Sequence, residues 1–178
     1  MLTVNDLFMG DPYLYFHENI YYLTGTADTD LGFKVYRSTN LDEWEDLGFA
    51  YRKNENSFGI RHYWAPEVFF HQRFFYMTYS ALDSSTRLLL MGLAVSSRPE
   101  GPFTDLHSPW FDLGYSAIDG HIFRDDDHRL YLYFSRNWTD RDTLIDHGVT
   151  YGVELLPDLS GLKSVPKLLL EASQPWEK

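Results

Sequence analysis

Two aspartates, Asp11 and Asp119, occupy corresponding places in a repeated sequence pattern, with Ala65 at the same place between them. The three positions follow one another at intervals of 54 residues. Two carboxyl groups that face a common site can do acid–base chemistry, in which one activates water and the other keeps a proton for a leaving oxygen. Glycoside hydrolysis is a reaction that requires such a pair. A single aspartate at a strand start is often a turn or cap residue, but two at equivalent positions favour catalysis.

The elements that position these carboxylates are predicted to be β-hairpins. Each repeat has an apolar strand, a polar turn and a second, aromatic strand, over residues 11–23, 65–77 and 119–132. A second strand pair follows each hairpin, with outer strands expected near Leu41, Pro99 and Pro157. Four strands per repeat of this length are typical of propeller blades, and no segment has a helical pattern of apolar residues. The sequence therefore predicts an all-β propeller.

The repeat divides the chain into blades of one partial domain. We expect blade 1 over about residues 6–50, blade 2 over about 60–108, blade 3 over about 115–170 and the start of a fourth blade over about 171–178. Three blades do not close a ring, because propellers have about four to eight blades and each blade is buried only against its neighbours. The sequence therefore predicts either a fragment that lacks further C-terminal blades or a chain whose open edges are covered by another copy.

Composition excludes several other classes of protein. The net charge of −11 argues against a nucleic-acid binder, and the absence of cysteine excludes disulfides and thiolate metal sites. No 18-residue apolar run or signal peptide is recognisable, so we expect a cytoplasmic protein without a membrane span. The histidines lack metal-ligand spacing, and Asp125, Asp126 and Asp127 fit a solvated turn better than a calcium loop. We expect no metal, no cofactor and no nucleic-acid partner.

The motifs at the three strand starts resemble glycoside hydrolase family 43. They are Gly10–Leu14, Trp64–Val68 and Ala117–Phe123, in order and at blade spacing. The family consists of five-bladed propellers and includes β-xylosidases and α-L-arabinofuranosidases. The resemblance implies that Asp11 is the general base and that Asp119 orients the general acid and raises its pKa. It also implies that Trp64 is an aromatic wall of the sugar pocket. Glu67 is a candidate substrate contact, with a structural hydrogen-bond acceptor as an equal alternative.

The general acid of the family is the glutamate of a Glu-Gly-Pro motif that opens blade 4. The one such motif here begins at Glu100, between outer strands of blade 2, so we reject it as the acid. Glu177 is close to the expected register but is not followed by Gly-Pro. The sequence thus predicts an inverting hydrolase of terminal β-xylosyl or α-L-arabinofuranosyl residues that ends before its general acid. An inactive carbohydrate-binding or assembly module on the same scaffold is the alternative.

Overall fold

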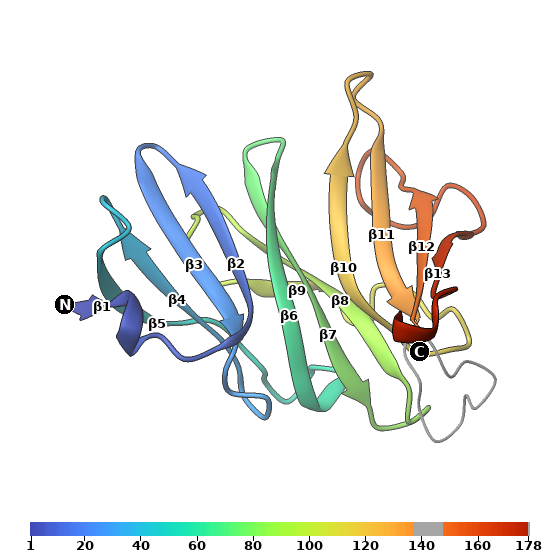
Figure 1. Cartoon of the computed structure of the whole chain (residues 1–178), viewed down its shortest axis with the longest axis horizontal. Coiled ribbons are helices and arrows are strands. Elements are labelled where there is room, and N and C mark those ends of the chain that lie inside the picture. Colours follow the sequence, from blue (N-terminus) through green and yellow to red (C-terminus); the bar gives the residue numbers. More distant parts are fainter. Residues whose placement is uncertain (137–147, 178) are drawn as a thin grey trace.

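The structure, a computed structural model, describes residues 1–136 and 148–177 and shows three antiparallel sheets side by side (Figure 1). The first sheet has the order β1-β5-β4-β3-β2, with β1 at Leu2–Thr3, β5 at Glu43–Arg52, β4 at Gly32–Ser38, β3 at Ile20–Thr26 and β2 at Gly10–His17. The second sheet has the order β6-β7-β8-β9, at Gly59–His71, Phe74–Asp83, Leu89–Ser96 and Thr104–His107. The third has the order β10-β11-β12-β13, at Ala117–Arg124, Leu130–Arg136, Val149–Glu154 and Lys167–Glu171.

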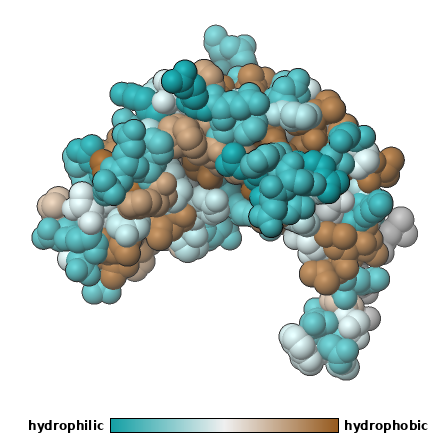
Figure 2. Space-filling view, turned by 90° about the horizontal axis from the view of Figure 1, so that it is seen from above, coloured by the Kyte–Doolittle hydropathy of each residue, from teal (hydrophilic) through white to brown (hydrophobic). Residues whose placement is uncertain are grey.

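This all-β architecture confirms the predicted fold class. The two 3-10 helices of the described residues, η1 at Val4–Asp6 and η2 at Pro175–Glu177, have three residues each, so no helix there has the length and hydropathy to cross a membrane. Strand β6 lies between β2 and β10, so the inner strands of the three sheets meet at the centre (Figure 1). The chain forms an open arch, hollowed between its two outer sheets (Figure 2).

The first two inner hairpins have the turn that their repeat predicts. Strands β2 and β3 are joined through Glu18 and Asn19, and β6 and β7 through Gln72 and Arg73. All four of these turn residues have positive φ, which is the geometry of a two-residue turn that matches the twist of the flanking strands. The third hairpin is longer at its turn, as the sequence indicates. Equal turns give equal registers, so corresponding residues of the first two inner strands lie at corresponding heights.

The sheets are held together by cores that form between them. One core joins the first and second sheets and contains the fully buried Phe33, Tyr63 and Met77. The other joins the second and third sheets and is built around residues such as Leu93 and Leu132. Since each face is buried only against the next sheet, the stability of every blade depends on its neighbour.

A network of hydroxyl groups around Asp105 reinforces the first of these cores. The hydroxyl of Tyr79 donates to Oδ1 of Asp105 at 2.6 Å, and the hydroxyl of Tyr51 donates to Oδ2 at 3.2 Å. The two tyrosine hydroxyl oxygens are 3.0 Å apart, and the Ser57 hydroxyl also donates to Asp105. Tyr51 belongs to the first sheet, whereas Tyr79 and Asp105 belong to the second. The network therefore ties two blades through groups that burial would otherwise leave without water.

The outward faces of the two outer sheets carry exposed apolar side chains. Tyr13 and Tyr15 of β2 pack against the core, so the alternating Leu14 and Phe16 point away from it and are about half exposed. At the other end, Leu169 and Leu170 of β13 are also exposed. Hydrophobic residues accordingly appear on both arms of the arch (Figure 2). What covers these faces stays a prediction.

The outer strand of the third sheet lies later in the chain than expected. Residues Pro157 to Leu159 form a turn, in which Asp158 accepts hydrogen bonds from both the backbone N–H and the hydroxyl of Ser160. The indole N–H of Trp110 donates to the backbone oxygen of Leu159, which fixes this turn against the core. The prediction of an outer strand near Pro157 is wrong, because side-chain bonds satisfy the local backbone and the strand forms only at Lys167–Glu171.

Candidate active site

The three repeat-equivalent residues share a backbone conformation that strands rarely adopt. Asp11, Ala65 and Asp119 have φ values of 47°, 46° and 58°. Each lies within a β-bulge, where the pairing of its inner strand with the next strand is interrupted. Left-handed backbone costs a non-glycine residue free energy and persists where the surrounding structure enforces it, which is often at functional sites. The bulges redirect these side chains out of the regular strand pattern.

Hydroxyl groups of the preceding blade hold two of the bulges. Thr26 of β3 accepts a hydrogen bond from the backbone N–H of Ala65 at 2.8 Å, across the first and second sheets. Ser80 of β7 accepts one from the backbone N–H of Asp119 at 3.2 Å, across the second and third sheets. Thr26 and Ser80 are themselves 54 residues apart. The hydrogen bond between a side-chain hydroxyl and the bulge of the next blade is therefore repeated along with the strands. Sequence reasoning missed both residues, although their spacing carried the signal.

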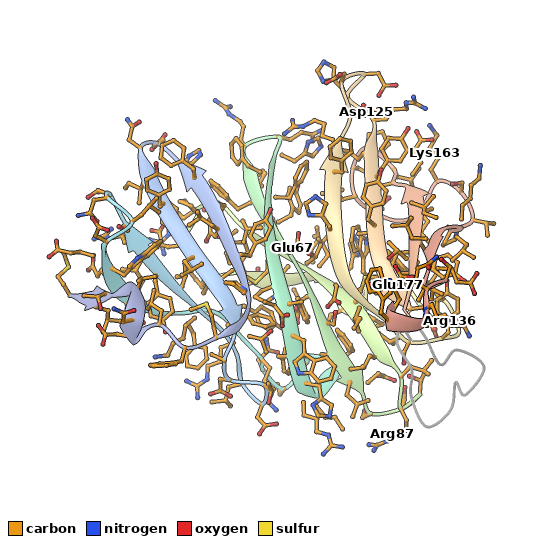
Figure 3. All side chains as sticks on the ribbon, viewed as in Figure 1. Glu67, Arg87, Asp125, Arg136, Lys163 and Glu177 are labelled. Atoms are coloured by element: carbon orange, nitrogen blue, oxygen red, sulfur yellow. The ribbon has the colours of Figure 1, made fainter. Side chains whose placement is uncertain are left out.

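One cavity gathers the candidate catalytic residues. It has a volume of about 180 Å³ and is lined by Asp11, Pro12, Tyr13, Ala65, Glu67 and Asp119. Its walls come from β2, β6 and β10, the three inner strands, and Figure 3 shows Glu67 at the centre of this row. The structure therefore brings together Asp11, Glu67 and Asp119, which are far apart in sequence. Larger hollows exist beside β13 and beside β5, but they lack such a convergence of carboxylates.

Asp11 is oriented by a hydrogen bond from its own blade. The Thr26 hydroxyl donates to Oδ2 of Asp11 at 2.7 Å while it accepts from the N–H of Ala65. This leaves Oδ1 of Asp11 without a hydrogen-bond partner in the described part of the chain. A carboxylate with one oxygen fixed and the other open to the cavity can accept a proton from a water molecule placed there.

Asp119 holds its proton more firmly than an ordinary aspartate. Burial raises its pKa to about 6, and the charges of Asp11 and Glu67 act in the same direction. Burial disfavours the charged form, and neighbouring carboxylates disfavour a further negative charge. The side chain still reaches solvent through the open cavity, so water is available to exchange its proton. Asp11 and Asp119 thus form a pair in which one carboxyl group promotes protonation of the other.

Glu67 is fixed by a residue of the third sheet. Its Oε2 lies 2.5 Å from Nδ1 of His121, and this hydrogen bond raises the pKa of His121 against the opposing effect of burial. The charge of Glu67 also contributes to the raised pKa of Tyr13, whose main cause is burial. The structure thus turns the His121 ring toward Glu67. Whether Glu67 contacts substrate stays a prediction.

Trp64 directly precedes Ala65, which lines the cavity, in the sequence. Its ring packs against that of His62, with ring centroids 4.9 Å apart. It is not among the residues that line the cavity. Its role as an aromatic wall for sugar stays a prediction.

Neither glutamate considered as a general acid lines the cavity. Glu100 lies in the turn between β8 and β9, 3.7 Å from Arg98. Glu177 lies at the end of η2 on the third sheet, away from Glu67 (Figure 3). Its carboxylate accepts hydrogen bonds from the backbone N–H groups of Gln174 and Ser173, which lower its pKa. Since a general acid must keep its proton near neutral pH, this environment does not suit one.

Comparison with known families gives this arrangement a context. The sequence profile of glycosyl hydrolases family 43 matches residues 4–177. The chain belongs to this family. Among curated members, it is 28% identical over 152 residues to xylosidase/arabinosidase 43A of Humicola insolens, a match that covers 76% of this chain and 46% of that protein. It is 41% identical over 64 residues to a beta-xylosidase of Xylanibacter ruminicola, which covers 36% of this chain and 19% of that one.

Solved structures of family 43 superpose on nearly the whole chain. A thermostable family-43 glycoside hydrolase matches with a TM-score of 0.86 and 41% identity, over 95% of this chain and 55% of its own. An endo-arabinase from Bacteroides thetaiotaomicron matches with a TM-score of 0.86 and 27% identity, over 96% of this chain and 59% of its own. The family 43 chain thus spans about half the length of these relatives.

Proposed function

We propose that this family 43 chain forms part of an inverting glycosidase that releases terminal β-xylosyl or α-L-arabinofuranosyl residues from plant cell-wall carbohydrates. The observation that carries the proposal is the single cavity in which Asp11, Glu67 and Asp119 converge from three inner strands. The names of relatives at 28% and 41% identity, a xylosidase/arabinosidase and a beta-xylosidase, support the choice of pentosides.

In this proposal Asp11 is the general base. The open Oδ1 takes a proton from a water molecule as the water attacks the anomeric carbon, and the hydrogen bond from Thr26 keeps the carboxylate in position. Attack by water on the face opposite the leaving group inverts the anomeric centre. Removing a positioned general base typically slows a reaction by a factor of about 10² to 10⁴.

Asp119 is the second functional carboxyl group. Its pKa of about 6 lets it retain a proton at mildly acidic pH. We propose that it orients the general acid and, when ionised, keeps a proton on that acid through like-charge repulsion. The acid itself is proposed to come from outside the described residues, either from further blades or from another copy that covers an open edge.

The experiment is turnover of 4-nitrophenyl β-D-xyloside and 4-nitrophenyl α-L-arabinofuranoside by the purified chain, with Asp11→Asn as the control. Proton NMR of the first product identifies its anomer. Release that depends on Asp11 and gives the inverted anomer supports the proposal. Release of the retained anomer, or release that is equally fast in the Asp11→Asn variant, contradicts it.

The absence of a general acid from the described cavity favours one second candidate, a carbohydrate-binding or assembly module without catalytic activity. Such a module keeps the cavity and its hydrogen-bonding groups but lacks proton donation to a leaving group. It binds D-xylose or L-arabinose without turnover, even when the remaining blades of a family member are supplied. Turnover restored by those blades excludes this candidate.

A further inference from the structure

A second set of repeat-equivalent residues lies next to the catalytic one. Tyr13, Glu67 and His121 each follow the left-handed residue of their strand by two positions, and they are also 54 residues apart. After each bulge, regular pairing with the neighbouring strand resumes at these residues, opposite Thr24, Thr78 and Tyr133 respectively. The repeat therefore brings three different side chains, a phenol, a carboxylate and an imidazole, to one level of the inner strands.

Within this set, His121 and Glu67 form a close pair across two blades. Nδ1 of His121 and Oε2 of Glu67 are 2.5 Å apart, with side chains that are 44% and 25% exposed. Glu67 lines the cavity, whereas His121 is not among the lining residues. His121 thus does not line the cavity itself but contacts Glu67, which does.

The charges around Glu67 explain why it needs such a partner. Asp11 on β2 and Asp119 on β10 line the same cavity of about 180 Å³, and the hydroxyl of Tyr13 offers no positive charge. Three carboxyl groups in so small a space repel one another when they are ionised. A protonated His121 opposes this repulsion at Glu67 and supplies a charge-assisted hydrogen bond of fixed direction.

We propose that His121 is a positioning residue for Glu67, which it holds on the cavity wall in the orientation in which the carboxylate accepts a hydrogen bond from a hydroxyl group of the bound pentose. This inference rests on the proposed function, since it requires a pentose in the cavity. Restricting a long side chain before the ligand arrives lowers the cost of ordering it on binding. The orientation of Glu67 depends on the hydrogen bond from Nδ1 of His121 and not on the other atoms of the imidazole ring.

Two substitutions of His121 distinguish the role of the Nδ1 donor from that of the imidazole ring as a whole. His121→Asn places an amide nitrogen near the position of Nδ1 and retains the donor, whereas His121→Gln places its amide nitrogen near the position of Nε2 and removes the donor from Glu67. We expect His121→Gln to weaken D-xylose binding about tenfold and His121→Asn to change it by about twofold or less. Calorimetry or NMR titration of the purified chain measures both affinities, and circular dichroism verifies that each variant is folded.

A double-mutant cycle with Glu67→Gln tests whether His121 acts through Glu67. We expect His121→Gln to have no further effect on D-xylose binding in the Glu67→Gln background, because the group that it positions is already changed. In the same Glu67→Gln variant, the titration midpoint of the His121 ring protons, followed by NMR, should fall relative to the parent chain.

Each other outcome has a defined meaning. Equal binding by the His121→Asn and His121→Gln variants, additive effects in the cycle, or an unchanged His121 midpoint in Glu67→Gln overturns the positioning role and leaves the proposed function intact. Absence of D-xylose and L-arabinose binding by the parent chain overturns the proposed function, and this inference with it.

Discussion

Asp11 and Asp119 are two repeats apart in sequence, yet both line the same cavity. Each of them has a left-handed backbone conformation within its strand. Their relationship is electrostatic as well as geometric, because the charge of Asp11 adds to the effect of burial in raising the pKa of Asp119 to about 6. The 54-residue repeat therefore specifies more than a scaffold. It places two carboxyl groups where the charge of Asp11 helps to raise the pKa of Asp119.

Asp119 should make the stability of the chain depend on pH. Its pKa is about 6 in the folded chain and about 3.9 in an unfolded one, so the folded state binds more protons between these values. The free energy of unfolding contributed by this group therefore falls as pH rises from about 4 to about 6 and stays lower above that range. Asp119→Asn should be more stable than the parent chain near pH 7.5, by about 1 kcal/mol after allowance for solvent exposure.

Urea unfolding near pH 7.5 and near pH 4 measures this difference. We expect the advantage of Asp119→Asn to become small near pH 4, where the aspartate is protonated in the folded state and about half protonated in the unfolded state. The carboxyl carbon resonance of Asp119 should titrate near pH 6 in the parent chain and lower in Asp11→Asn. An advantage of equal size at both pH values would show that charge is not its cause.

The Thr26 hydroxyl connects the Asp11 carboxylate to the next blade, so its removal should affect stability. Thr26→Val keeps the shape of the side chain but removes the acceptor for the N–H of Ala65 and the donor to Asp11. We expect a loss of about 1–3 kcal/mol in the free energy of unfolding, since a backbone N–H is left without a partner. Thr26→Ser retains the hydroxyl and is the matched control. A loss in Thr26→Val no larger than that in Thr26→Ser would contradict the role of the hydroxyl group, because valine keeps the methyl group that serine lacks.

The network around Asp105 should contribute to the attachment of blade 1 to blade 2. Tyr79→Phe removes the hydroxyl that donates to Asp105 at 2.6 Å and leaves this carboxylate with fewer partners. We expect the free energy of unfolding to fall by about 1–3 kcal/mol without a change in the denaturant slope. Thermal or urea unfolding measures it. Tyr36→Phe is the control, because the hydroxyl of Tyr36 makes no hydrogen bond within residues 1–136 and 148–177 and is partly exposed. A comparable loss in Tyr36→Phe would contradict the role of the network.

Much of the fold could be predicted from sequence because the inner hairpins carry a strict repeat. Spacing alone aligned Asp11, Ala65 and Asp119, and the structure gives all three the same backbone conformation. The outer strands lack this signal. The strand expected near Pro157 is a turn held by Asp158 and Trp110, contacts that depend on the third dimension.

The details of the site could be predicted only in part. Regular strand alternation does not tell where Asp119 and His121 point, because a bulge interrupts the strand between Ile118 and His121. The pair of Glu67 and His121 also depends on how closely two sheets approach. The spacing of Thr26 and Ser80 was visible in the sequence, but their bonds to the next blade became apparent only with the sheets in place.

The central claim is that Asp11 acts as a general base in this cavity, and the dependence of hydrolysis on the leaving group tests it most directly. A dinitrophenyl β-D-xyloside releases a stable anion and needs no general acid, whereas xylobiose requires protonation of its leaving oxygen. The account predicts that the purified chain hydrolyses the dinitrophenyl substrate about 10² to 10⁴ times faster than its Asp11→Asn variant, and that it hydrolyses xylobiose only where further blades or another copy supply the acid. Equal rates for the chain and the Asp11→Asn variant on the dinitrophenyl substrate would contradict it.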